Sequence, residues 1–178
     1  MLHIICLIVL LAVVTFVVKC LNRGDEEALC RTILSAMLAI YIMGYMYFAF
    51  FSREVGSEPR VNLVPFQSYV YLFDRSLDSA RFATSFKLIG LEAASPGIGM
   101  ILNILLYYPL GYLLPSLLPK LKAKHVILIG CLCSIATEAI QYFFVIGCCE
   151  TDDVIHNTLG TTIGVLMYCV QRLRFTCR

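Results

Sequence analysis

Charged residues are scarce in this chain, and their scarcity argues against a soluble globular domain. Only 15% of the 178 residues are charged, whereas 60% are hydrophobic. A soluble domain of this length could accommodate such a composition only by burying far more apolar surface than its size allows. The composition therefore predicts a protein that resides in a lipid bilayer.

Familiar catalytic, metal-binding and nucleic-acid-binding patterns are also missing. The sequence has no HExxH, no Ser-His-Asp spacing and no glycine-rich phosphate loop, which argues against hydrolysis by a familiar constellation. No basic patch is interleaved with aromatic residues, so nucleic acid is not an expected partner. Cys131 and Cys133 lack further ligands at zinc spacing. We expect no metal and no cofactor.

Long apolar runs, in contrast, are abundant. A membrane-spanning helix needs about 20 mostly apolar residues. The chain offers five such runs, at about 2–18, 32–51, 98–118, 125–146 and 154–170. The first run has neither a basic start nor a small-residue cleavage site behind it, which indicates an uncleaved anchor. The runs predict an all-α, polytopic membrane bundle of about five transmembrane helices, formed as a single integral domain over residues 1–178.

The distribution of basic residues predicts the orientation of this bundle. With the N-terminus outside, most of the 14 Lys and Arg residues fall in cytoplasmic segments, namely Lys19, Arg23, Arg31, Lys120, Lys122, Lys124, Arg172, Arg174 and Arg178. The expected topology is therefore N-out and C-in.

The segment 52–97 is then an outer loop. Its centre, YVYLFDRSLDSARFATSFKLIGLEAA, alternates aromatic and charged residues in a way that is typical of an interfacial amphipathic helix. A helix that only caps the bundle is the alternative. Cys148 and Cys149 face the same outer compartment, where a disulfide or a reactive role stays open, although adjacent cysteines bridge each other only with strain.

Polar side chains in three of the expected helices lie at one depth. At 1.5 Å per residue, Asn103 lies roughly 7 Å below the outer surface, and Gln141 lies at a similar depth. Glu138 is about one turn deeper than Gln141, and Asn157 is about one turn into the last helix. The sequence thus predicts a polar level near the outer side of the membrane.

Helical phase strengthens this prediction. Ser134, Glu138 and Gln141 follow i, i+4, i+7 spacing on one face, and Asp153 and Asn157 follow i, i+4 spacing on another. An acid in mid-helix costs about 2.5–3.5 kcal/mol on insertion scales, so Glu138 should face the bundle interior and find a partner. Gln141 and Asn157 are the expected partners.

Two further features concern the last helix. Gly160 and Gly164 form a G-x-x-x-G pair that lets another helix approach closely, and the helix expected over 125–146 is one candidate. Glu150, Asp152 and Asp153 lie at its start, where an aspartate can cap free N–H groups and the helix dipole favours negative charge.

The polar residues admit several interpretations. A polar lock that only joins helices is one, and a binding or catalytic pocket open to the outer leaflet is another. A metal held by Glu138, Asp153 and His156 is a weaker alternative.

Four blocks of the sequence resemble the VanZ-like membrane proteins, in the same order. They are RVNLVPF at 60–66, ILNILLYYPLGYLLP at 101–115, SIATEAIQYFF at 134–144 and ETDDVIHNTLGTTIG at 150–164. The resemblance covers residues 60–168. Its pattern falls here on Arg60, Asn62, Pro65, Phe66, Asn103, Pro109, Gly111, Glu138, Gln141, Glu150, Asp153, Asn157 and Gly160. Many members carry an arginine and an aromatic residue where this chain has Cys148 and Cys149, so any role of that arginine falls here to Arg60 or is absent.

This resemblance implies a multi-pass protein of the bacterial cytoplasmic membrane, most often in Gram-positive organisms, and a link to resistance against lipoglycopeptide antibiotics such as teicoplanin. One hypothesis is a binding protein in which Arg60 and Asn62 contact the head group of a membrane lipid or lipid-linked envelope polymer. The other is an intramembrane enzyme with Asp153 or Glu138 as general acid or base. The sequence leaves binding versus catalysis, the ligand and the oligomeric state open.

Overall fold

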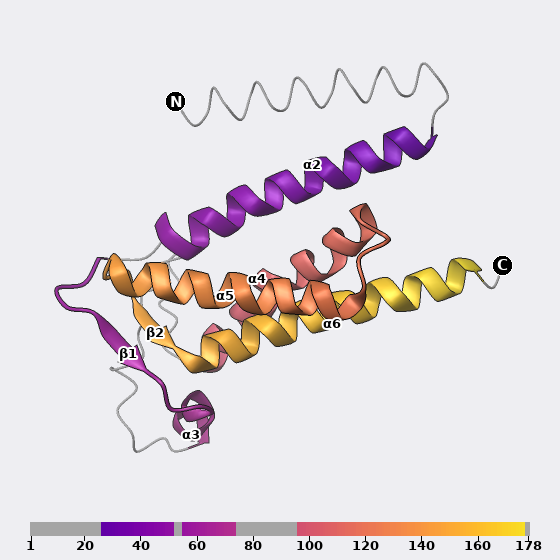
Figure 1. Cartoon of the computed structure of the whole chain (residues 1–178). Coiled ribbons are helices and arrows are strands. Elements are labelled where there is room, and N and C mark those ends of the chain that lie inside the picture. The colour runs from indigo at the N-terminus through magenta and orange to yellow at the C-terminus, as the bar shows by residue number, and fades with distance from the viewer. Residues whose placement is uncertain (1–25, 52–54, 74–95, 177–178) are drawn as a thin grey trace, which may run out of the picture.

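The computed structural model describes residues 26–51, 55–73 and 96–176, and its architecture is mostly helical (Figure 1). The helices are α2 (Glu26–Met46), which continues as the π-helix η1 (Tyr47–Phe51), α3 (Gln67–Phe73), α4 (Pro96–Leu117), α5 (Ala123–Phe143) and α6 (Thr151–Thr176). Two short strands, β1 (Arg60–Asn62) and β2 (Cys148–Glu150), complete the described part. The predicted helical bundle is present, and the strands were not predicted.

Three of the described helices are long and apolar enough to cross a membrane. They comprise Glu26–Phe51, Gly99–Leu117 and Ala123–Phe143. The first expected span, at about 2–18, lies outside the described residues. The prediction of about five transmembrane helices is therefore wrong for the described residues. Three of their helices qualify as candidate spans, and α6 is not one of them.

The composition of α6 explains this difference. Its inward face carries polar side chains that are buried against the neighbouring helices, and these are Asp152, His156, Asn157 and Thr161. Its outward face carries exposed Leu159, Ile163 and Leu166. A helix whose polar stripe is hidden by its neighbours needs an apolar surface on one side only, so hydropathy summed over all its residues is low.

Glycines allow α6 to lie directly on α4. A Cβ atom added at Gly160 would come within 2.2 Å of the carbonyl oxygen of Ile104, and one at Gly164 within 2.2 Å of the carbonyl oxygen of Tyr108. Gly111 on α4 approaches the Thr161 backbone in the same way. The partner of the G-x-x-x-G pair is therefore α4, and the prediction that the helix over 125–146 is this partner was wrong.

Hydrogen bonds attach α2 to the bundle near its C-terminal end. The Tyr45 hydroxyl lies 2.7 Å from the Tyr107 hydroxyl and also bonds the Thr137 hydroxyl. Gln141 Nε2 donates to the carbonyl oxygen of Ala49, 2.8 Å away, inside η1. A π-helical turn departs from the i→i−4 bonding pattern, so a side-chain donor stabilises it at this point.

Part of the expected outer loop is ordered against the start of α6. β1 pairs in parallel with β2, with Arg60 opposite Cys148 and Asn62 opposite Glu150. α3 covers only the beginning of the amphipathic helix expected there, and residues 74–95 lie outside the described residues. Cys148 and Cys149 are free thiols, with no disulfide to each other or to another cysteine of the described residues.

Candidate functional site

Three acidic residues gather where β2 meets α5 and α6. Burial raises the pKa of the Cys149 thiol, and the negative charges of Glu138, Asp153 and Glu150 raise it further. Carboxylates from α5, β2 and α6 therefore all lie close enough to this one thiol to affect its pKa. We call Glu138, Glu150 and Asp153 the acidic cluster.

Hydrogen bonds hold two members of the acidic cluster in place. The backbone N–H of Glu150 donates to Glu138 Oε2 over 3.0 Å, and Asn103 Nδ2 donates to Asp153 Oδ1 over 2.6 Å. Glu138 is only 4% exposed and faces the bundle interior. Asn103, from α4, thus joins the same group of polar side chains as the acids of α5 and α6.

The two amides that were expected to contact Glu138 have different surroundings. Gln141 is directed to η1 through its bond to Ala49. Asn157 Nδ2 donates to Ser134 Oγ over 2.8 Å, one helical turn from Glu138. Asn157 is 4% exposed, and its Oδ1 atom has no hydrogen-bond partner among the described residues. A buried acceptor without a partner is costly, and it marks a place where a donor is expected to bind.

Asp152 belongs to a different contact. Its two carboxylate oxygens accept the backbone N–H groups of Phe66, at 2.5 Å, and Ser68, at 2.7 Å. One turn further along α6, His156 Nε2 lies 3.1 Å from the Tyr69 hydroxyl. The hypothesis that Asp152 only starts its own helix is therefore wrong, because its carboxylate also fixes the start of α3.

Arg60 and Asn62 lie on β1, beside the acidic cluster. Arg60 is exposed, and its positive charge partly opposes the rise in the pKa of Cys148, which places the guanidinium near that thiol. Asn62 Oδ1 accepts the backbone N–H of Val64 over 3.3 Å and so stabilises the local chain direction. Arg60 is the better candidate for contact with a ligand.

The described residues do not support a metal centre. Within 26–51, 55–73 and 96–176, no three His, Cys, Asp or Glu side chains converge in a way that could hold a metal ion. His156 is directed at Tyr69. The alternative in which His156 joins Glu138 and Asp153 on a metal is therefore wrong for this part of the chain.

Sequence reasoning missed the hydroxyl groups that lie beneath the acidic cluster. Tyr45, Tyr107 and Thr137 form a bonded group between α2, α4 and α5. Tyr107 is 1% exposed, so its hydroxyl needs a partner inside the bundle. Thr137 could have been suspected from the sequence, because it lies directly beside Glu138. Nothing in the sequence indicated that Tyr45 and Tyr107 would contact Thr137.

We expect the Cys148 thiol to be unusually slow to alkylate. Burial, with the negative charge of Glu150 beside it, raises the pKa of Cys148 to about 12. The thiolate is the nucleophile, and at pH 7 its fraction falls roughly tenfold for each unit by which the pKa rises. A variant retaining only Cys148 should react slowly with iodoacetamide at pH 7 and still accelerate above pH 9, where an ordinary thiol reaches its plateau.

The same variant unfolded in detergent provides the matched control and should regain ordinary reactivity. A folded-state profile that levels off near pH 9 would contradict the burial of this thiol.

Comparison with known proteins agrees with this arrangement of blocks. The VanZ/LLP1 family model matches residues 37–172, which include α4, α5, both strands and most of α6. No curated protein and no solved structure matches the chain. The matched region contains every residue of the acidic cluster, and it extends well beyond half of the sequence. The chain belongs to the VanZ/LLP1 family.

Proposed function

We propose that this membrane protein binds a lipid-linked component of the bacterial cell envelope at the outer leaflet, with the head group received by the acidic cluster. The observation that carries the proposal is the unpartnered Asn157 Oδ1, a buried acceptor beside Ser134 and one turn from Glu138. Exposed Arg60 lies at the rim of the same group. Together these residues offer several acceptors and one strong donor.

The chemistry of these groups indicates the class of head group. Carboxylate and amide oxygens accept hydrogen bonds from hydroxyl and amine groups. A guanidinium binds phosphate oxygens in a bidentate manner. A phosphate that carries a sugar or an amine therefore fits this set better than either group alone.

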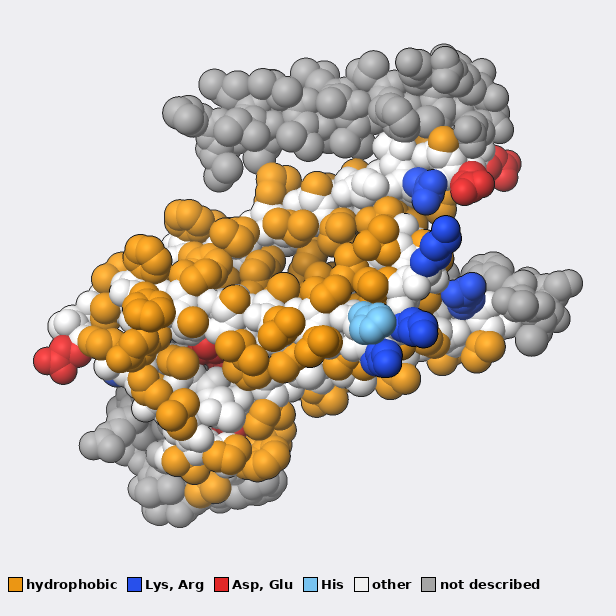
Figure 2. All heavy atoms as spheres, in the orientation of Figure 1, with side chains coloured by type: hydrophobic (Ala, Val, Ile, Leu, Met, Phe, Trp, Pro, Cys, Tyr) orange, Lys and Arg blue, Asp and Glu red, His pale blue; other side chains and the backbone are white. Residues whose placement is uncertain are grey.

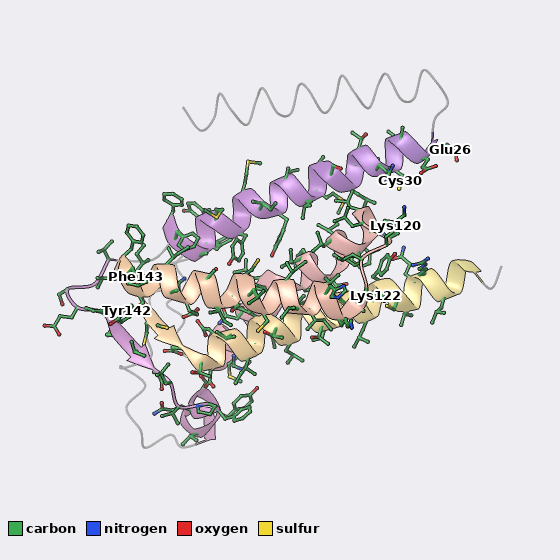
Figure 3. The ribbon with its side chains drawn as sticks, viewed as in Figure 1. Glu26, Cys30, Lys120, Lys122, Tyr142 and Phe143 are labelled. Carbon is green, nitrogen blue, oxygen red and sulfur yellow. The ribbon has the colours of Figure 1, made fainter. Side chains whose placement is uncertain are left out.

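The distribution of basic residues supports an outer location. The Lys and Arg side chains that Figure 2 shows lie mostly at one end of the bundle. Glu138, in contrast, lies near the C-terminal end of α5, and Glu150 follows in β2. Lys120 and Lys122 are at the end opposite Tyr142 and Phe143 (Figure 3). Basic residues favour the cytoplasmic side, so the acidic cluster would face the outer leaflet and α2 would run outward.

An intramembrane acid/base enzyme is the second candidate. It is favoured by the proximity of Glu138 and Asp153, both of which lie close enough to Cys149 to raise the pKa of its thiol. Two carboxyl groups in different surroundings can serve as the acid and the base of one reaction. In this case a lipid-linked cell-wall precursor would be converted, whereas a binding protein would retain it unchanged.

Teicoplanin susceptibility tests the proposed role in a Gram-positive host. Cells would express wild type, Glu138→Gln or Asp153→Asn, with membrane abundance matched by blotting. We expect wild type to protect and both isosteres to fail. Glu58→Gln is the matched control, because Glu58 is exposed and lies outside the acidic cluster. Equal protection by both isosteres would overturn a working role for the acids.

Binding of a purified lipid-linked precursor to the protein in nanodiscs distinguishes the two candidates. Loss of a hydrogen bond to a charged group costs about 1.5–3 kcal/mol, so each isostere should weaken binding by about 10- to 100-fold. Saturable binding with the precursor recovered unchanged supports a binding protein. Time-dependent conversion that both isosteres abolish would establish the enzyme instead. Wild type that neither protects nor binds would overturn the proposal.

A further inference from the structure

The segment from Val61 to Phe73 carries no charged residue, and much of its apolar surface faces outward. Its outward-facing apolar side chains are each half exposed or more, and they are Val61, Leu63, Val64, Phe66 and Val70. Leu63 alone is 70% exposed. Contiguous apolar surface in contact with water costs about 25 cal/mol per Å², so a patch of this kind indicates an apolar partner.

Contacts with α6 determine where this segment lies along that helix. Asp152, in the first turn of α6, holds the backbone of Phe66 and Ser68. Tyr69 reaches His156, one turn deeper along the same helix. α3 therefore lies beside the start of α6, and it also contacts α4 (Figure 1).

The patch adjoins the apolar surface of a membrane-spanning helix. Phe143 is 78% exposed at the end of α5, and Phe144 beside it is also exposed. The chain from Phe144 leads directly into β2, which pairs with β1. Figure 2 shows hydrophobic side chains over this end of α5 and over the segment below it. The end of a spanning helix marks the bilayer interface, so the adjoining patch lies at the same interface.

We propose that residues 61–73 form a wedge that inserts into the interface of the bilayer, with Leu63, Val64 and Phe66 against the acyl chains of the leaflet. The occupant of this surface is lipid. The absence of charge over the whole segment matches an apolar environment, since a single charged side chain there would oppose insertion.

The carboxylate of Asp152 makes this arrangement possible for an irregular backbone. Non-helical backbone in an apolar environment is tolerated only where its polar groups are satisfied by the protein. Phe66 has a φ of 64°, which interrupts regular structure just before α3. Asp152 accepts the N–H groups of Phe66 and Ser68, which would otherwise remain unpaired at the turn.

The wedge has a consequence for access to the acidic cluster. β1, at the start of the wedge, pairs with β2, and Glu150 of β2 donates its N–H to Glu138. Lipid in contact with the wedge therefore lies near β2, which forms one side of the acidic cluster. A membrane-bound ligand can approach from within the leaflet by lateral diffusion, without crossing the aqueous phase.

Tryptophan fluorescence tests the wedge directly, because the chain contains no tryptophan. Leu63→Trp would be reconstituted into liposomes of ordinary or brominated phosphatidylcholine. Leu132→Trp, exposed on the membrane-spanning helix α5, is the lipid-facing reference. Lys120→Trp, exposed in the connection between α4 and α5, is the aqueous reference outside the helices. No ligand is needed, so a negative result leaves the proposed function standing.

We expect blue-shifted emission for Leu63→Trp and quenching by brominated lipid at least half that of Leu132→Trp. Iodide should quench it weakly, and less than it quenches Lys120→Trp. Strong iodide quenching with no effect of bromine would overturn the wedge, because the segment would then lie in water. Resistance to both quenchers would also overturn it, because protein and not lipid would cover the patch. Val64→Trp provides a second probe if Leu63→Trp does not fold.

Discussion

Replacement of Gly160 by valine is expected to separate α6 from α4 and to remove most folded protein from the membrane. A Cβ atom at this position would come within 2.2 Å of the Ile104 carbonyl oxygen, which is closer than any real Cβ contact. The obstructing atom belongs to the backbone of α4 and cannot turn aside as a flexible side chain would. Overpacking of this kind costs about 3 kcal/mol.

The measurement is the monodisperse fraction and the apparent Tm of the detergent-solubilised protein by fluorescence-detected size-exclusion chromatography. Gly164→Val should behave like Gly160→Val, since its Cβ would meet the Tyr108 carbonyl oxygen at 2.2 Å. Gly44→Val on α2 is the matched control, because nothing lies within 4 Å of a Cβ there. Wild-type behaviour of Gly160→Val would contradict the direct contact between α4 and α6.

The second large effect is expected for Asp152→Ala. This change leaves the N–H groups of Phe66 and Ser68 without their acceptors, at about 1–3 kcal/mol for each orphaned amide. The first turn of α3 should detach from α6. Limited proteolysis should then cleave within residues 60–73 at least tenfold faster than in wild type, while α4, α5 and α6 remain associated.

Asp152→Asn separates charge from hydrogen bonding in this contact. Asparagine retains one acceptor oxygen in nearly the same shape, so its cleavage rate should lie between those of wild type and Asp152→Ala. Protection of the segment in Asp152→Ala equal to that in wild type would show that the carboxylate does not hold α3.

The pattern of hydrophobic residues was sufficient to predict the long apolar helices. The runs at 32–51, 98–118 and 125–146 correspond to helices within a few residues, because about 20 apolar residues have no stable alternative to a helix in a bilayer. The inward direction of Glu138 follows from the same rule, since an acid in an apolar helix must avoid lipid. The four sequence blocks likewise identified the family that the comparison supports.

Contacts between distant segments could not be obtained in that way. Asp152 and Ser68 are separated by 84 positions, and neither carries a local sign of the other. The pairing of β1 with β2 and the choice of α4 as the partner of Gly160 also depend on where whole helices lie. Each is selected by a fit between surfaces, which is a property of the packed chain and not of any window along it.

By itself, then, the sequence determined a helical membrane protein of the VanZ/LLP1 family with polar residues near one level of its helices. The reason is that hydropathy and helical phase act over a few turns and can be read residue by residue. Only the tertiary structure decided that the Asp152 carboxylate binds the backbone at the start of α3, that Asn157 keeps an unpaired acceptor, and that Glu138 accepts the N–H of Glu150. Hydrogen-bond partners are set by distances across the bundle, and these exist only after the helices have packed.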